Sequence, residues 1–242
     1  MKDSLGDRMK TSYEDRSRYL LPRRSYTIFR IDGKAFHTYT RGLEKPFDND
    51  LIEDMDATAA YLCKNIMGAK LAYVQSDEIS VVVTDFESIT TQAWFDNNLQ
   101  KMVSVSASLA TGKFNELRFK RGINKLAFFD SRIFQIPDRT EVENYLIWRY
   151  RDCVKNSISM VANYYYSPKQ LHGLSSDQRQ ELLFQKGINW SKYSEGFKNG
   201  RIIINENYLK EASIGSNETV IRRKWISKPF DKSYFNIIPS YA

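Results

Sequence analysis

The 242-residue sequence has no long hydrophobic run and very little cysteine or histidine. A helix that crosses a bilayer needs about 18 or more consecutive apolar residues, so we expect no membrane association. The first ten residues are charged and polar, which argues against a signal peptide. Only Cys63 and Cys153 are present, both in helix-like patterns. We therefore expect no disulfide framework and a reducing, cytoplasmic environment.

Several catalytic signatures are missing as well. The two cysteines and two histidines do not have the spacing of a zinc site. The sequence contains no Gly-x-x-x-x-Gly-Lys-Ser/Thr loop, and no Ser, His and Asp form the pattern of a nucleophilic triad. Internal repeats and low-complexity segments are also absent from it. These absences argue against disulfide scaffolds, zinc modules, P-loop enzymes and repeat proteins.

Positive charge is in excess, since 36 Lys and Arg against 29 Asp and Glu give a net charge of +7. The excess alone fits an ordinary basic protein as well as a nucleic-acid binder. Clustering of the basic residues favours RNA, because cations attract phosphates and nearby aromatic rings offer stacking surfaces. The candidate RNA contacts are Lys113, Arg118, Lys120 and Arg121, then Arg132, Lys155 and Asn156, and finally Arg222, Arg223 and Lys224.

Hydrophobic patterning over the first 137 residues predicts the order β-α-β-β-α-β. This order gives an α+β fold of the ferredoxin-like type, a four-stranded antiparallel sheet with two helices on one face. The first and third strands are then central neighbours. Strands are expected at 25–31, 71–75, 79–84 and 126–136, the last one interrupted at 130–132, and helices at 51–67, closed by Gly68, and at 90–119.

Beyond residue 137 the pattern changes to helices followed by a β-ribbon. We therefore divide the chain into residues 1–137, which include an N-terminal arm, and a C-terminal region, 138–242. Thr140 to Glu143 has the pattern of a capping box that opens a long helix. That helix is expected to run towards Tyr166, with further helical pieces at 175–187 and 189–198 and ribbon strands at 200–204 and 219–225.

Two of the predicted strand ends carry acidic residues. Asp32 and Gly33 follow the first strand, and Asp77 and Glu78 lie at the turn between the second and third strands. Because the predicted topology brings both turns to one edge of the sheet, Asp32 and Asp77 are candidate ligands of two Mg²⁺ ions. Gly33 could add a backbone carbonyl, since a glycine allows close approach. By spacing alone, these residues could equally be ordinary turn and capping residues.

The turn after the first strand is also a candidate phosphate site. Successive backbone N–H groups from Gly33 to His37 could surround a triphosphate, with Lys34 and Lys45 neutralising its charge. Each residue has an ordinary alternative: Lys34 as a solvated turn residue and His37 as a structural histidine. Ser76 could contact phosphate or ribose, or could simply form a turn.

Three motifs in order resemble the tRNA-histidine guanylyltransferase superfamily. They are Arg30–His37, Glu44–Asp48 and Gln75–Glu78, and Phe129–Arg132, Trp148–Cys153 and Lys186–Trp190 fit the same pattern. The resemblance spans roughly residues 5 to 204 and implies a palm-type catalytic domain that extends RNA in the 3′-to-5′ direction. In such enzymes ATP adenylylates an RNA 5′ end. The 3′-hydroxyl of an incoming nucleotide, often GTP, then attacks that end and AMP leaves.

The resemblance also implies roles for single residues. Asp32 and Asp77 would hold two Mg²⁺ ions, with Gly33 as a backbone ligand and Glu78 as a further catalytic residue behind them. The expected substrates are ATP, GTP and tRNA, and the family's tetramers imply a homo-oligomer. The nucleotide site would be formed by Asp32, Gly33, Lys34, Ala35, Phe36, His37, Lys45, Asp48, Ser76 and Asp77.

One segment departs from the eukaryotic members of the superfamily. After Asp152-Cys153 they carry His-Ile-Asn-Asn-Leu-Tyr-Asn-Thr, whereas this chain continues as Val-Lys-Asn-Ser-Ile-Ser-Met-Val. The sequence is more similar to bacterial, archaeal and phage members, which resemble repair polymerases that rebuild truncated tRNA 5′ ends. We therefore expect template-dependent repair. The alternatives are strict addition of one G to tRNA-histidine, a non-catalytic RNA-binding protein and, more distantly, a nucleotidyl cyclase.

Overall fold

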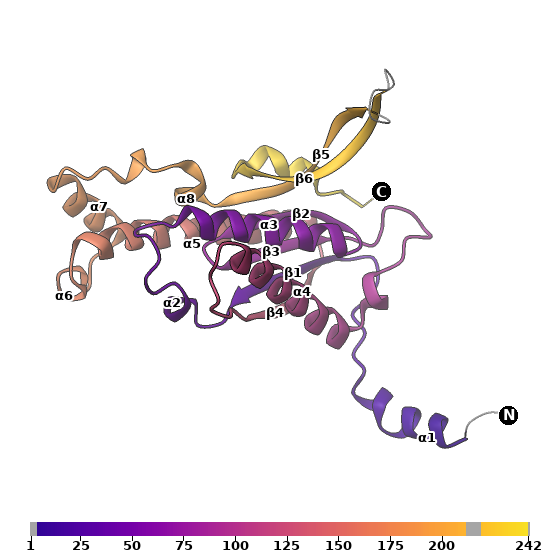
Figure 1. The fold of residues 1–242 in the computed structure, drawn as a ribbon. Coiled ribbons are helices and arrows are strands. Elements are labelled where there is room, and N and C mark those ends of the chain that lie inside the picture. The colour runs from indigo at the N-terminus through magenta and orange to yellow at the C-terminus, as the bar shows by residue number, and fades with distance from the viewer. Residues whose placement is uncertain (1–3, 212–218, 242) are drawn as a thin grey trace.

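A six-stranded antiparallel sheet lies at the centre of the computed structural model, which describes residues 4–211 and 219–241 (Figure 1). The strands, in the order β4-β1-β3-β2-β5-β6, are β1 (Tyr26–Gly33), β2 (Ala69–Gln75), β3 (Glu78–Val83), β4 (Phe129–Ile136), β5 (Arg201–Glu211) and β6 (Thr219–Pro229). The helices are α1 (Ser4–Ser12), α2 (Phe36–Tyr39), α3 (Asn49–Asn65), α4 (Leu99–Lys120), α5 (Arg139–Tyr165), α6 (Pro168–Leu171), α7 (Ser176–Gln185) and α8 (Glu195–Asn199). Short 3-10 helices are η1 (Glu14–Ser17), η2 (Trp94–Asn97), η3 (Trp190–Lys192) and η4 (Lys232–Ile237).

The first four strands confirm the predicted ferredoxin-like α+β arrangement. β1 pairs with β3 on one side and with β4 on the other, so it is central as expected. Met55 of α3 and Phe114 of α4 share one core with Phe29 of β1. Side chains alternate across a strand, so Phe29 and its neighbour Ile28 point to opposite faces of the sheet. The two predicted helices therefore cover one face.

Helix α5 covers part of the opposite face. Val142, Leu146 and Cys153 of this helix share a second core with Ile28 and Val82 of the sheet. Burial of these side chains removes apolar surface from water, which favours the packed arrangement by about 25 cal/mol per Å². The sheet is thus a middle layer between α3 and α4 on one side and α5 on the other.

The C-terminal ribbon continues the same sheet instead of standing apart. β5 pairs with β2, with Ala72 opposite Ile203 and Val74 opposite Arg201. Figure 1 shows the far ends of β5 and β6 extending beyond the helices, with α6 and α7 at the other end of the molecule. The predicted division after residue 137 stays a prediction, and the sheet itself runs across it.

Several local expectations were wrong. The N-cap of α5 is Asp138 rather than Thr140, because its carboxylate accepts the Glu141 N–H at 3.0 Å. β4 runs without a break through the expected interruption at 130–132. The helix expected from residue 90 begins only after Asn98, whose side chain accepts the Lys101 N–H. α3 ends at a C-cap on Ile66 rather than on Gly68, and η3 and α8 replace a single helical piece at 189–198.

In the part of the chain that the structure describes, no helix is both long and apolar enough to span a bilayer.

A buried ion pair joins α3 to α4. Arg118 is completely buried, and its Nη1 donates to the Asp54 carboxylate at 3.0 Å. Arg121 donates to the same carboxylate from nearer the surface. The prediction that Arg118 contacts RNA was therefore wrong, because its guanidinium has no access to a ligand outside the protein.

Asp54→Asn should destabilise the protein by about 3–5 kcal/mol, because it leaves the buried Arg118 charge without a counterion. Urea unfolding measures this difference directly. Lys120→Ala, which removes an exposed ion pair with Glu116, should cost less than about 1 kcal/mol. Equal unfolding midpoints for Asp54→Asn and wild type would contradict the assigned role.

Candidate active site at one edge of the sheet

The ends of β1 and β3 bring the two predicted acidic turns together. Asp32 lies opposite Glu78 in the antiparallel register, and the Gly33 N–H donates to the Asp77 carbonyl at 3.1 Å. Ser76 takes a left-handed conformation (φ 45°), which tightens the turn that carries Asp77. The shared sheet edge expected from the topology is therefore confirmed.

Both carboxylates have raised pKa values, so their ionised forms are unfavourable without a bound cation. Burial, and then the neighbouring Asp32, raises the pKa of Asp77 to about 6. Burial, and then Glu78, raises the pKa of Asp32 as well. Each pKa rises because a partly desolvated negative charge faces another one. A bound divalent cation would relieve both costs.

The donor set at this edge suits Mg²⁺. Within residues 4–211 and 219–241, no three or more Asp, Glu, His or Cys side chains form a cluster that could hold a metal. Mg²⁺ commonly takes one or two protein carboxylates and completes its shell with water and substrate phosphates. Asp32 and Asp77 supply two carboxylates, so they fit Mg²⁺ ions whose remaining ligands come from water and the phosphates of a nucleotide.

Gly33 has a packing role that its sequence position did not reveal. A Cβ atom at this residue would lie 2.3 Å from the ring of Phe36. The glycine therefore makes room for Phe36, which packs into the core beside Phe114 and Phe129. Its role as a backbone metal ligand stays a prediction.

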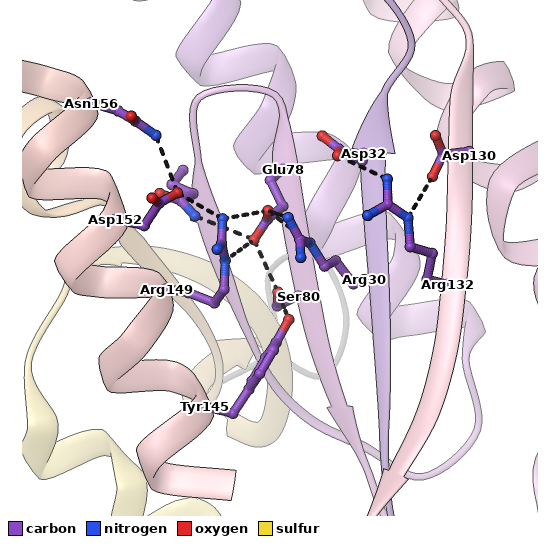
Figure 2. A network of polar contacts seen from close by, with 11 residues as sticks. Arg30, Asp32, Glu78, Ser80, Asp130, Arg132, Tyr145, Arg149, Asp152 and Asn156 are labelled. Carbon is purple, nitrogen blue, oxygen red and sulfur yellow. Dashed lines mark hydrogen bonds and ion pairs between the residues drawn. The ribbon is translucent and has the colours of Figure 1, made fainter. Parts of the chain in front are cut away.

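Glu78 lies opposite Asp32 in the strand register and belongs to a buried polar network (Figure 2). Its two oxygens accept hydrogen bonds from Arg149 Nε and Nη2, both at 2.7 Å. Arg30 Nε donates to the same carboxylate at 2.9 Å. Glu78 thus joins β1, β3 and α5 through two guanidinium groups, and it does not line the cleft described next. Its catalytic role stays a prediction.

A cleft of about 570 Å³ opens beside Asp32 and Asp77. This size is typical of small-molecule sites. Lys34 alone among the predicted nucleotide residues is outside the lining, and its side chain is exposed. The predicted residues that line the cleft are Asp32, Gly33, Ala35, Phe36, His37, Lys45, Asp48, Ser76 and Asp77.

The far wall of the cleft comes from residues that the sequence analysis did not assign to the nucleotide site. Ser157 and Met160 of α5 contribute, together with Asn156, which was predicted as an RNA contact. The rings of Phe47 and Phe197 stack at 4.5 Å between centroids and give an apolar surface suited to a nucleobase. These residues are distant in sequence, so no local motif could have grouped them.

Arg201 adds a buried cation to the same wall. Its Nε donates to Asp56 at 2.7 Å, and its residue is only 6% exposed. The neighbouring Gly200 marked a strand start in the sequence, but no sequence signal tied Arg201 to the nucleotide site. The C-terminal region therefore contributes directly to the cleft.

The other predicted RNA contacts fall into two groups. Lys113 and Lys120 pair with Glu116 on α4, and Arg121 pairs with three carboxylates of α3. Arg121 therefore links α4 to α3, whereas Lys120 stays 65% exposed despite its pair with Glu116. The second group also has exposed side chains: Arg132, whose Nη2 lies 3.5 Å from Asp32 Oδ2, Lys155 on α5, and Arg222, Arg223 and Lys224 on β6. Contact of either group with RNA stays a prediction.

Comparisons with known proteins agree on one family. The family model described as tRNAHis guanylyltransferase matches residues 6–137. A bacterial tRNA(His) guanylyltransferase-like protein, solved in complex with ATP, is 49% identical with a TM-score of 0.81, covering 93% of this chain and 92% of that one. Another, solved in complex with GTP, is 44% identical with a TM-score of 0.81, covering 96% and 99%. The tRNA(His) guanylyltransferase of Eremothecium gossypii is 32% identical over 208 residues, 76% of this chain and 84% of the relative.

Asp77→Asn should stabilise the metal-free protein at pH 7.5. The pKa of Asp77 is about 6 in the fold, above its ordinary value of 3.8. The ionised carboxylate therefore costs stability above pH 6, and this cost disappears as the pH falls towards 4. The expected gain at pH 7.5 is of the order of 2 kcal/mol, allowing for partial exposure, and it should vanish near pH 4.

Thermal unfolding in EDTA across this pH range measures the effect. Added MgCl₂ should raise the Tm of wild type more than that of Asp77→Asn, because the variant lacks a ligand. A constant difference in Tm from pH 4 to 8 would contradict the assigned pKa.

Proposed function

Because the chain belongs to the tRNA(His) guanylyltransferase family and is a nucleotidyltransferase, we propose that it rebuilds the 5′ ends of truncated tRNA by template-dependent 3′-to-5′ addition. The observation that carries this proposal is the position of Asp32 and Asp77 at the rim of a nucleotide-sized cleft. Templated repair is favoured over single G addition by the altered segment after Cys153. The higher identity to the bacterial guanylyltransferase-like structures supports the same choice.

The first reaction is activation of the RNA. ATP occupies the cleft, with its base against the apolar wall that Phe47 and Phe197 form and its phosphates towards Ser76 and Lys45. An oxygen of the RNA 5′-monophosphate attacks the α-phosphorus of ATP. The bond to the β-phosphate breaks, pyrophosphate leaves, and the RNA end becomes adenylylated.

The second reaction extends the RNA. The 3′-hydroxyl of the incoming nucleotide, GTP where the template is C, attacks the 5′-phosphate of the adenylylated RNA, and AMP leaves. Two Mg²⁺ ions held by Asp32 and Asp77 would stabilise the attacking and leaving oxygens in both reactions. Base pairing with the opposite strand selects the nucleotide, so the protein only needs to position the phosphates and the RNA end.

One alternative activity has specific support, and a non-catalytic alternative does not. Strict addition of G to tRNA-histidine is supported by the relatives that carry this name, including the one from Eremothecium gossypii. A non-catalytic RNA-binding protein would use the exposed basic side chains of β6 but would leave the paired carboxylates without a purpose.

We also propose that the protein assembles as a homo-oligomer, as the resemblance to the family implies.

Asp32→Ala and Asp77→Ala should each lower nucleotide addition by about 100-fold or more, because each removes a carboxylate that would hold the ions at the reacting phosphates. Radiolabelled addition to a 5′-monophosphorylated RNA measures the rate. A gel-shift assay serves as the control, and RNA affinity should change little. Near-normal addition by either variant would contradict the two-metal site.

A panel of tRNAs that lack one 5′ nucleotide separates repair from single G addition. The opposing base is varied among A, C, G and U, and the added nucleotide is identified. Under our proposal the added nucleotide is the Watson–Crick partner in each case. Addition of G regardless of the opposing base would establish strict guanylyltransfer instead.

A further inference from the structure

Trp148 on α5 is an exposed aromatic side chain that neither the cleft nor the core accounts for. Half of the residue, 52%, is exposed. It lies outside the lining of the cleft, to which α5 contributes Cys153, Asn156, Ser157 and Met160, all from turns after Trp148. An exposed indole beside an active site that handles RNA is a candidate surface for base stacking.

The indole ring is held in place although it is exposed. The Arg149 guanidinium lies 4.6 Å from the ring centroid, and the Arg30 guanidinium lies 5.8 Å from it. Both arginines are themselves fixed by hydrogen bonds to Glu78, as Figure 2 shows. The ring of Tyr145 packs edge-on against the indole at 5.9 Å. A ring ordered in advance loses little entropy when a base stacks on it.

The ring is also close to the catalytic edge. Arg30 precedes Asp32 by two residues in β1, so both side chains point to the same face of the sheet about 7 Å apart. Arg132 lies opposite Arg30 in β4 and is 56% exposed. A nucleic-acid strand that reaches Asp32 across this face would meet an aromatic ring and an exposed cation together.

We propose that Trp148 stacks on a base at or next to the 5′ end of the RNA substrate. The RNA, rather than the free nucleotide, is the occupant, because the mononucleotide cleft lies along other turns of α5. Arg132 supplies the positive charge that an RNA phosphate requires. This inference rests on the RNA substrate of the proposed function, but it concerns binding and not the addition reaction.

The experiment uses the full chain and a truncated tRNA that carries 2-aminopurine as its 5′-terminal base. Binding is followed without nucleotide, by anisotropy for affinity and by 2-aminopurine fluorescence for stacking. Trp148→Ala should weaken RNA binding about 5- to 150-fold and abolish the quenching of 2-aminopurine. Trp148→Phe should keep most of both, which shows that a lost aromatic surface and not a misfolded helix explains the alanine variant.

Two controls restrict the effect to the RNA end. Tyr164→Ala removes another aromatic side chain of α5 that is 53% exposed, and it should bind RNA like wild type. Calorimetric titration with ATP and GTP should give the same affinities for Trp148→Ala as for wild type. Full quenching and wild-type affinity in Trp148→Ala would overturn the proposal.

Other outcomes would replace the proposal with a different role. A loss of GTP affinity instead of RNA affinity would place the incoming nucleotide on the ring. A change in light-scattering mass alone would make Trp148 a contact between copies of the chain. If wild type binds and quenches the RNA but adds no nucleotide, the proposed function fails while the stacking site stands.

Discussion

A buried carboxylate between two guanidinium groups determines how the catalytic edge is built. Glu78 directly follows Asp77, and its oxygens accept hydrogen bonds from Arg149 of α5 and Arg30 of β1. Such buried pairs contribute little net stability, because desolvation of the charges offsets their attraction. Their consequence is geometric, because the hydrogen bonds between Arg149 and Glu78 fix the position of α5 relative to the turn that carries Asp77. The far wall of the cleft and the exposed Trp148 ring both depend on that position.

The same edge concentrates negative charge that the fold alone does not neutralise. Burial and mutual repulsion raise the pKa values of Asp32 and Asp77. Arg132 approaches Asp32 only at 3.5 Å and stays largely exposed, so it compensates little. A site of this kind gives up stability in the free protein and recovers it when cations and phosphates bind. This loss of stability in the free protein follows from placing like charges in a partly desolvated environment.

The sequence predicted the fold of the first 137 residues well, and the reason is local. Asp48 comes just before the predicted helix at 51–67, and it is the N-cap of α3, where its carboxylate accepts the Leu51 N–H at 2.7 Å. The predicted β-α-β-β-α-β order placed the first strand beside the third, and the observed register of β1 with β3 brings Asp32 and the turn that carries Asp77 to one edge. Arg118 shows the limit, because a basic residue at the end of a helix has the same sequence pattern whether it faces RNA or a buried Asp54.

The sequence by itself determined the paired carboxylates, the strand order that joins them and most of one wall of the cleft, because these depend on local periodicity and on motifs within short segments. Only the tertiary structure decided the other wall. Ser157, Phe197 and Arg201 meet the nucleotide site because α5 crosses the sheet and β5 joins β2. Those contacts depend on packing between segments more than 70 residues apart, and no periodicity within either segment encodes them.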